Sequence, residues 1–263
     1  MKVFSDLIYR QTPQRSLRLD LRVPNTENPP LVMYIPMGGM RVCEKENVPL
    51  ELVEQGFALA SIECRVRSEA IAPAQIYDCQ AAVRWLRAHA SEYCYDSVNI
   101  AAWGSSAGGM LAALLATSGN SFSLLEQDCE YPEVSCAVQA AVDACGAPHS
   151  LDYFARPDVQ QRFPGVTETL RLYLGGAVEE CLELAHLVSP SAYISPACPA
   201  ILIIQGEEDN VVPPEETVFF HQLLLQAGVD AELILLPNVG HDWDEKLTEP
   251  NINRFLKRVL MKQ

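Results

Sequence analysis

The residues best suited to do chemistry lie in the segment Gly104-Ser105-Ser106-Ala107-Gly108, between an apolar stretch and a run of small residues with helical spacing. This segment fits the pattern G-x-S-x-G, in which small residues on either side of a serine let a strand turn directly into a helix. A serine at that turn projects its hydroxyl from a helix N-terminus, where backbone amides favour negative charge. The spacing predicts Ser106 as a nucleophile and Ser105 as a turn residue.

A serine hydroxyl is a weak nucleophile unless a histidine takes its proton and a carboxylate orients that histidine. Two such residues come later in the chain, each in a loop after an apolar stretch: Asp209 follows 200–206, and His241 follows 231–237. Serine, acid and histidine in this order complete a hydrolytic triad. We therefore predict Ser106, Asp209 and His241 as catalytic residues, and we prefer Asp209 to its neighbours Glu207 and Glu208. The remaining histidines, which we interpret as structural, are His89, His149, His186 and His221.

Attack on a carbonyl also requires hydrogen-bond donors for the oxyanion that develops. One predicted donor is the backbone N–H of Ala107, which follows the nucleophile. The second comes from the loop "PMGGMR" at 36–41, where Gly38 and Gly39 would let the backbone approach a substrate. The alternative is that these two glycines form only a tight turn.

Four further residues are candidates for a substrate pocket. Met37, Met40 and Arg41 belong to the loop at 36–41, and Trp243 follows His241 by two positions. Arg41 either meets an acidic or sugar-bearing substrate or is a solvated loop charge, and we favour the second interpretation. Trp243 either lines the cleft or packs against the protein.

Strand and helix patterns alternate along most of the chain. The predicted strands are 2–9, 16–23, 31–36, 57–64, 98–104, 137–146, 200–206 and 231–237, and the predicted helices include 74–93, 107–119, 214–228 and 251–260. This order is typical of a mostly parallel sheet with helices on both faces. We expect the first two strands to form an antiparallel edge. We predict a single α/β domain over 1–263, with a helical cap or lid insertion at about 148–193, where no strand pattern appears.

Composition excludes several classes of protein. The chain of 263 residues has a net charge of −15, which disfavours binding to nucleic acid and to anionic membranes. No apolar stretch is long enough to span a membrane. Nine cysteines without a C-x-x-C pair, together with an N-terminus unlike a secretory signal, favour reduced thiols and a cytoplasmic location. No metal or organic cofactor is expected.

With these residues in place, the chain resembles the α/β-hydrolase superfamily, and more narrowly the bacterial esterases of the hormone-sensitive-lipase-like and feruloyl/acetylxylan-esterase-like branches. The stretches that carry the likeness are "PAQIYDCQAAVRWLRAHA", "WGSSAGGMLAALLATSG", "SPSAYIS", "GEEDNVVP" and "AGVDAELILLPNVGH". Enzymes of this group usually carry His-Gly-Gly at the oxyanion loop, whereas this chain has Pro36-Met37-Gly38-Gly39. The resemblance implies the α/β-hydrolase fold, with Ser106 as nucleophile, Asp209 as acid, His241 as base and Gly38, Gly39 and Ala107 as oxyanion donors.

The activity expected from this reading is hydrolysis of carboxylic esters with short acyl groups, of acetyl or feruloyl type, including esters on carbohydrate. An amide or formamide hydrolase on the same triad, resembling an arylformamidase or an aminopeptidase, remains the alternative. A hydrolase-like protein that binds without catalysis is the third possibility, against which the intact triad argues. Neither the natural substrate nor the oligomeric state follows from the sequence.

Overall fold

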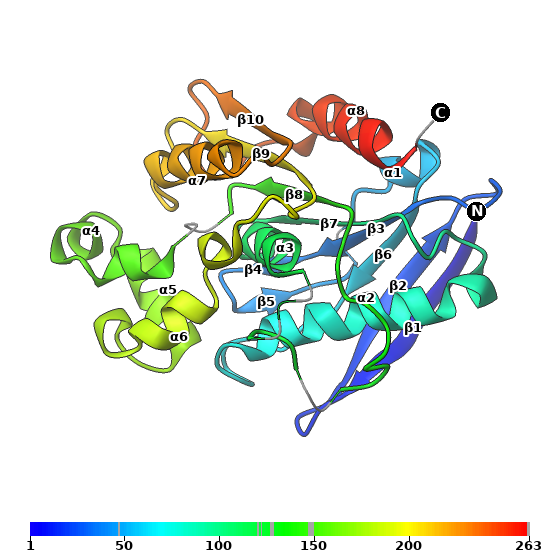
Figure 1. The fold of residues 1–263 in the computed structure, drawn as a ribbon, viewed down its shortest axis with the longest axis horizontal. Helices are drawn as coiled ribbons and strands as arrows, with labels where there is room; N and C mark the ends of the chain where they lie inside the picture. The colour runs from blue at the N-terminus through cyan, green and yellow to red at the C-terminus, as the bar shows by residue number, and fades with distance from the viewer. Residues whose placement is uncertain (47, 120, 122, 127–128, 147–149, 262–263) are drawn as a thin grey trace.

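The computed structural model describes the chain except for residues 47, 120, 122, 127–128, 147–149 and 262–263 (Figure 1). Its centre is an eight-stranded sheet in the order β1-β2-β6-β3-β7-β8-β9-β10. The strands are β1 (Lys2–Gln11), β2 (Ser16–Val23), β3 (Leu31–Ile35), β6 (Ala58–Ile62), β7 (Ile100–Ser105), β8 (Ala140–Ala144), β9 (Ala200–Gly206) and β10 (Ala231–Leu236). This architecture confirms the predicted α/β fold.

The sheet is parallel from β6 to β10 and antiparallel at its N-terminal edge. β1 pairs with β2, and β2 with β6, in antiparallel register, whereas the pairs from β6 onward are parallel. All five residues of β3, of β6 and of β8 are buried, as expected for strands covered on both faces. The carboxyl ends of the parallel strands therefore meet at one edge of the sheet.

Helices cover both faces of the sheet, as predicted (Figure 1). On one face lies a large core that includes residues of α2 (Ala74–Tyr93), α3 (Ala107–Ser118) and α7 (Pro214–Gln226). On the other face a smaller core contains residues of α1 (Glu51–Glu54) and α8 (Glu249–Leu260). All twelve residues of α3 are buried, because this helix packs between the sheet and the segment that follows β8.

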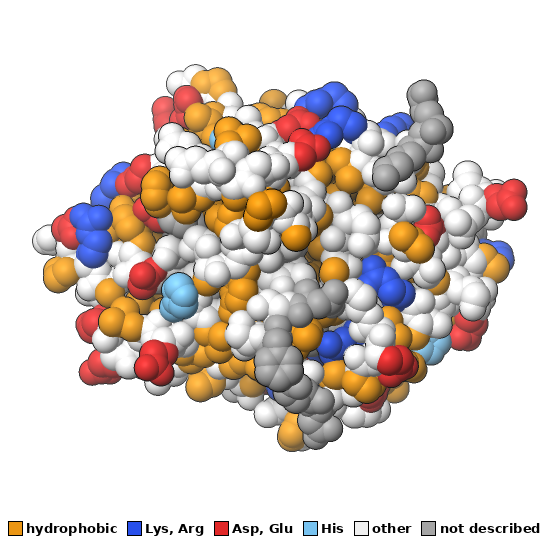
Figure 2. Space-filling view, viewed as in Figure 1, with side chains coloured by type: hydrophobic (Ala, Val, Ile, Leu, Met, Phe, Trp, Pro, Cys, Tyr) orange, Lys and Arg blue, Asp and Glu red, His pale blue; other side chains and the backbone are white. Residues whose placement is uncertain are grey.

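The described part of the segment predicted as an insertion, 150–193, contains helices and no strand. They are η1 (Leu151–Ala155), α4 (Pro157–Arg162), α5 (Pro164–Leu174), η2 (Val178–Glu180), α6 (Leu182–Leu187) and η3 (Pro190–Tyr193). Helices α4, α5 and α6 lie at the left of Figure 1. Acidic side chains are scattered over the face shown in Figure 2, including this segment. The predicted start at 148 lies outside the described residues.

A short hairpin follows β3, and the sequence patterns do not predict it. Its strands, β4 (Met37–Gly38) and β5 (Val42–Cys43), have two residues each. Strands this short show no periodicity in sequence. Among the helices described, none is long and apolar enough to cross a membrane.

Candidate active site

Ser106 lies at the junction of β7 and α3, with φ 54° and ψ −122°. A positive φ is uncommon for a residue other than glycine and stores backbone strain, which persists where the surroundings enforce it. Here the N–H of Ser106 donates to the carbonyl of Ala144 at 2.8 Å, which ties the turn to the end of β8. The turn is therefore the strand-to-helix elbow that the glycine spacing predicted.

The two glycines that flank the elbow leave no room for a side chain. A Cβ atom on Gly104 would overlap the backbone of Gly108, and one on Gly108 would overlap the carbonyl oxygen of Ile35. These contacts let α3 begin directly against β7 and β3. The G-x-S-x-G pattern is thus explained by close backbone packing around Ser106.

The three residues predicted as a triad come together at the carboxyl edge of the sheet. Ser106 Oγ lies 2.9 Å from His241 Nε2, and His241 Nδ1 lies 2.8 Å from Asp209 Oδ2. Asp209 follows β9, His241 follows β10, and Ser106 follows β7. Three loops that are far apart in sequence therefore form one hydrogen-bonded chain from carboxylate to hydroxyl.

The carboxylate of Asp209 accepts four hydrogen bonds. Its Oδ1 accepts the backbone N–H groups of Val211 and Val212, both at 2.8 Å, and its Oδ2 accepts from His241 and from Gln205 Nε2, also at 2.8 Å. Burial alone would raise the pKa of Asp209, but hydrogen bonds from His241 and from these amides outweigh it and lower the pKa. Asp209 is therefore ionised where it contacts the imidazole.

Gln205 is a site residue that sequence reasoning missed. Its amide oxygen accepts the hydroxyl of Thr217 at 3.0 Å, so that its N–H₂ group points to Asp209. Both side chains are buried. A buried glutamine in an otherwise apolar strand, four positions before the acid, is the signal that would have indicated it.

The loops that carry the acid and the histidine are held together by their backbones. Glu207 N–H donates to the carbonyl of Leu236 at 3.0 Å, and Glu208 N–H donates to that of Val239 at 2.9 Å. A Cβ atom on Gly206 would overlap the carbonyl oxygens of Val239 and Gly240, so a glycine is required there. The side chains of Glu207 and Glu208 are exposed, while Asp209 is buried.

The predicted oxyanion loop is the β4–β5 hairpin, and Gly38 lines the same cavity as Ser106. Gly39 has φ +54°, and its carbonyl accepts a hydrogen bond from the Arg67 guanidinium at 3.1 Å. Arg67 N–H in turn donates to the carbonyl of Met40 at 2.7 Å. Arg67 thus supports the loop from the segment after β6. Ala107, as the first residue of α3, has an N–H without an intrahelical acceptor.

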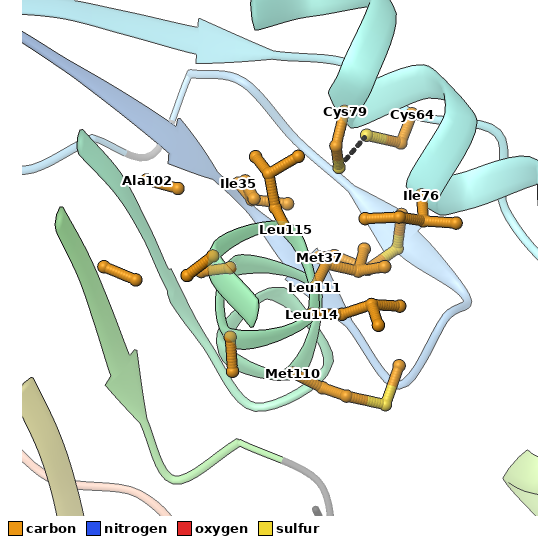
Figure 3. Close-up of a cluster of buried hydrophobic side chains, with 14 of the residues drawn as sticks. Ile35, Met37, Cys64, Ile76, Cys79, Ala102, Met110, Leu111, Leu114 and Leu115 are labelled. Atoms are coloured by element: carbon orange, nitrogen blue, oxygen red, sulfur yellow. Dashed lines mark hydrogen bonds between the residues drawn. The ribbon is translucent and has the colours of Figure 1, made fainter. Parts of the chain in front are cut away.

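The four candidate pocket residues have different environments. Met37 lines the cavity and is also buried among core side chains that include Leu111 of α3 (Figure 3). Met40 is buried in the same core, and Arg41 is exposed on the hairpin turn. Neither Met40 nor Arg41 is among the described residues that line the cavities at Ser106 and His241. The exposure of Arg41 agrees with a solvated charge.

Two cavities adjoin the candidate triad and share Tyr34, Ser105 and Asp242. The larger, of about 300 Å³, is lined further by the hairpin, by Ser106 and by Glu44. The smaller, of about 160 Å³, is lined by His241, Ala144, Trp103, Trp243, Thr248 and Ile252. Trp243 therefore lies in a cavity wall, where its indole N–H donates to Thr248 Oγ1 at 3.3 Å. Ser105 contacts Cys145, with Oγ and Sγ 3.4 Å apart.

Two of the other histidines make contacts outside this hydrogen-bonded chain. His89 stacks on Trp85, and His221 contacts the carbonyl of Ala231 at 3.2 Å. His186 belongs to α6, and His149 lies outside the described residues. In the part of the chain that the structure describes, no three histidine, cysteine or acidic side chains gather where they could hold a metal ion.

Known proteins similar to this chain are esterases. A family model named BD-FAE matches residues 19–224. The esterase LipC of Mycobacterium tuberculosis is 28% identical over 225 residues, which make up 83% of this chain and 54% of LipC. The esterase LipQ of the same organism is 27% identical, over 82% of this chain and 50% of LipQ. The chain thus spans about half the length of these relatives.

Solved structures with the same fold cover nearly the whole chain. A truncated carbohydrate esterase from gut microbiota has a TM-score of 0.82 at 25% identity, and the match covers 100% of this chain and 97% of that one. Esterase Est2 of Thermogutta terrifontis, solved with propionate bound, has a TM-score of 0.79 at 23% identity and covers 99% and 93%. The family match extends over more than half of the sequence and includes the elbow at Ser106 and the acid loop. The chain belongs to the BD-FAE family, within the α/β-hydrolases.

Proposed function

We propose that this chain is a serine hydrolase of carboxylic esters. The observation that carries the proposal is the hydrogen-bonded chain from Asp209 through His241 to Ser106, with separations of 2.8 Å and 2.9 Å, at the carboxyl edge of a parallel sheet. This edge is where open α/β sheets bind their ligands. The esterases named among the relatives support the same reaction class.

In the proposed mechanism His241 Nε2 takes the proton of Ser106 while the serine oxygen attacks the acyl carbon. The carbon–oxygen bond to the alcohol then breaks, and the departing oxygen takes the proton from His241. Water enters, gives a proton to His241 and attacks the acyl-enzyme, which releases the acid and restores the serine hydroxyl. Asp209 holds the imidazole in the required tautomer and stabilises its charged form.

The oxyanion of both tetrahedral intermediates is assigned to the N–H of Ala107 and to the hairpin N–H groups at Gly38 and Gly39. Three features support this assignment: Ala107 begins a helix, Gly38 shares a cavity with Ser106, and Arg67 holds the Gly39 carbonyl. Loss of one such donor typically reduces transition-state stabilisation by about 3–4 kcal/mol.

For the substrate we infer a short acyl group, of acetyl or feruloyl type, on a polar alcohol such as a carbohydrate. The volumes of the two cavities, about 160 and 300 Å³, suit a small acyl group on one side and a larger alcohol on the other. One of the similar structures is described as a carbohydrate esterase. We further propose that residues 1–263 act as one domain, with the helical segment at about 148–193 as its cap.

A panel of esters graded by acyl length and by alcohol, with amides and formamides in parallel, tests this function. We expect hydrolysis of short-chain esters, no turnover by Ser106→Ala, and one fluorophosphonate adduct that maps to Ser106. The variant Ser91→Ala, at an exposed position of α2, is the matched control and should keep both activity and labelling. An unlabelled protein, or an active Ser106→Ala, would refute the proposal, and a preference for amides would favour the alternative hydrolase.

A further inference from the structure

Asp143 is a buried acid beside the candidate site. The proposed mechanism gives it no role, and the ion pairs between described residues do not include it. It belongs to β8, is 4% exposed and lies opposite Gly104 of β7 in the sheet register. Side chains alternate along a strand, so Asp143 points to the same face as Ala141, which belongs to the core beneath α2 and α3. The carboxyl group therefore lies under the helix that begins at Ala107.

Two glycines form a cradle for this carboxyl group. A Cβ atom on Gly109, the third residue of α3, or on Gly146 would overlap Asp143 Oδ1. A Cβ atom on Gly109 would also come within 3.0 Å of the Ala144 carbonyl oxygen, which accepts the N–H of Ser106. The carboxyl group of Asp143 and the carbonyl group of Ala144 thus both face Gly109 in the first turn of α3.

The cradle suits a neutral acid better than a carboxylate. Oδ1 is fully buried and has no hydrogen-bond partner among the residues that the structure describes. Burial raises the pKa of Asp143 to about 7, and a hydrogen bond with the Gly146 backbone only partly opposes this. A protonated carboxyl can lie beside the Ala144 carbonyl, whereas a carboxylate would be repelled by it.

Among the described residues, none that packs against Asp143 is a cation that would neutralise a carboxylate. Helix α3 has the sequence AGGMLAALLATS, and the register partners on β7 and β9 are Gly104 and Ile203. One titratable group that interacts with Asp143 is the Cys145 thiol, whose pKa is raised to about 12, first by burial and further by the charges of Asp209 and Asp143. A charge on Asp143 would therefore add to that of Asp209.

The N-terminus of α3 is also where the proposed oxyanion forms. Its positive end favours one negative charge, and a second one nearby would compete for the same backbone N–H groups. We propose that Asp143 is a positioning residue that acts as a neutral carboxylic acid. It packs against the first turn of α3 and so holds the elbow at Ser106 in place, and because it is uncharged it does not compete with the substrate oxyanion for the N–H groups at the N-terminus of α3. Ionisation of Asp143 then slows ester hydrolysis. This inference rests on the proposed function of Ser106.

The test is the pH dependence of kcat for wild type, Asp143→Asn and Glu207→Gln. Asparagine has the shape of the protonated acid and cannot ionise. We expect wild-type kcat to fall by about tenfold as the pH rises through 7, and Asp143→Asn to keep its activity and lose this fall. Glu207 is an exposed acid at the same edge of the sheet, so Glu207→Gln should follow the wild-type curve.

Several outcomes would overturn the inference: a wild-type kcat that stays flat on the alkaline side, an Asp143→Asn variant that keeps the fall, or one that is inactive at every pH although it is folded. If Asp143→Asn fails to fold, infrared spectra of wild type decide, because the band of a protonated carboxyl must disappear over the range in which kcat falls. A wild-type protein that shows no serine labelling at any pH would instead refute the proposed function.

Discussion

Gln205 Nε2 lies 2.8 Å from Asp209 Oδ2, the same carboxylate oxygen that accepts the N–H of His241. Asp209 is therefore oriented by a side chain of β9, the strand that precedes it, and by the backbone N–H groups of Val211 and Val212 in its own loop. Side chains that orient a catalytic group need support of this kind, because a small misplacement greatly reduces the rate.

Asp209→Asn should keep the fold and lower kcat by about 10⁴-fold, because an amide cannot stabilise the charged imidazole and favours the wrong tautomer. Its neighbours Glu207 and Glu208 are exposed, so Glu208→Gln serves as the matched control and should change kcat by less than about twofold. Steady-state kinetics on a short-chain ester measure both variants. An active Asp209→Asn would mean that another carboxylate orients His241.

Gly108→Ala should destabilise the protein by about 1–3 kcal/mol or more, because the new methyl group would overlap the carbonyl oxygen of Ile35 at the point where α3 begins. Gly165→Ala is the control, since a Cβ there meets no atom within 4 Å and the residue lies inside α5. That change should be neutral or stabilising by about 0.5–1 kcal/mol. Urea unfolding of the two variants checks the difference, and equal stabilities would contradict the close packing at the elbow.

The stability of the protein should depend on pH through Asp143. The pKa of Asp143 is about 7 in the folded chain, against an ordinary value of 3.8 for an aspartate, so between about pH 4 and pH 7 the folded state keeps a proton that the unfolded state releases. Stability is therefore highest below about pH 4 for this group and falls as the pH rises to 7, by an amount on the order of 4 kcal/mol.

Asp143→Asn lacks this titration. Relative to wild type, its free energy of unfolding should rise between pH 5 and pH 8, as measured by urea unfolding at both values. Asp96→Asn is the control, because hydrogen bonds from Asn99 and Val98 overcome desolvation and lower the pKa of Asp96. The stability from that group is lost only as the pH falls below about 4, so its difference from wild type should stay constant between pH 5 and pH 8. A difference between wild type and Asp143→Asn that does not change with pH would show that Asp143 keeps one charge state throughout.

The charge of the larger cavity should select against anionic esters. Glu44 and Asp242 line it, and its described lining residues include no lysine or arginine. Each exposed carboxylate typically changes the interaction with a charged substrate by up to about 1 kcal/mol. The double variant Glu44→Gln/Asp242→Asn should raise kcat/KM for a succinate monoester by about fivefold and leave that for a neutral acetate within about twofold.

Glu46→Gln is the control for this charge effect, because Glu46 is exposed but does not line the cavity. Salt should reduce the discrimination in wild type, since the charges are open to solvent. If kcat/KM rose equally for the anionic and the neutral ester, the effect would come from the shape of the cavity and not from its charge.

Periodicity predicted the parallel sheet, its antiparallel edge and the helices on both faces, because buried strands and amphipathic helices leave regular patterns. The β4–β5 hairpin left no pattern, because each of its strands has two residues. The helical nature of 150–193 was expected, whereas the positions of its short helices depend on contacts with α3 and with one another.

The sequence by itself determined which residues have the chemistry: the glycine spacing singles out Ser106, and the chain order of Asp209 and His241 follows from the strands before them. Only the tertiary structure decided which side chains support them. Gln205, Arg67 and Asp143 lie in ordinary strand and loop sequences, and each also contacts a residue of another element. These residues are Thr217 for Gln205, Gly39 for Arg67 and Gly109 for Asp143. Their contacts depend on which face a side chain takes and how closely two backbones approach, and Gly109 and Gly146 make that approach possible only once the sheet and α3 are assembled.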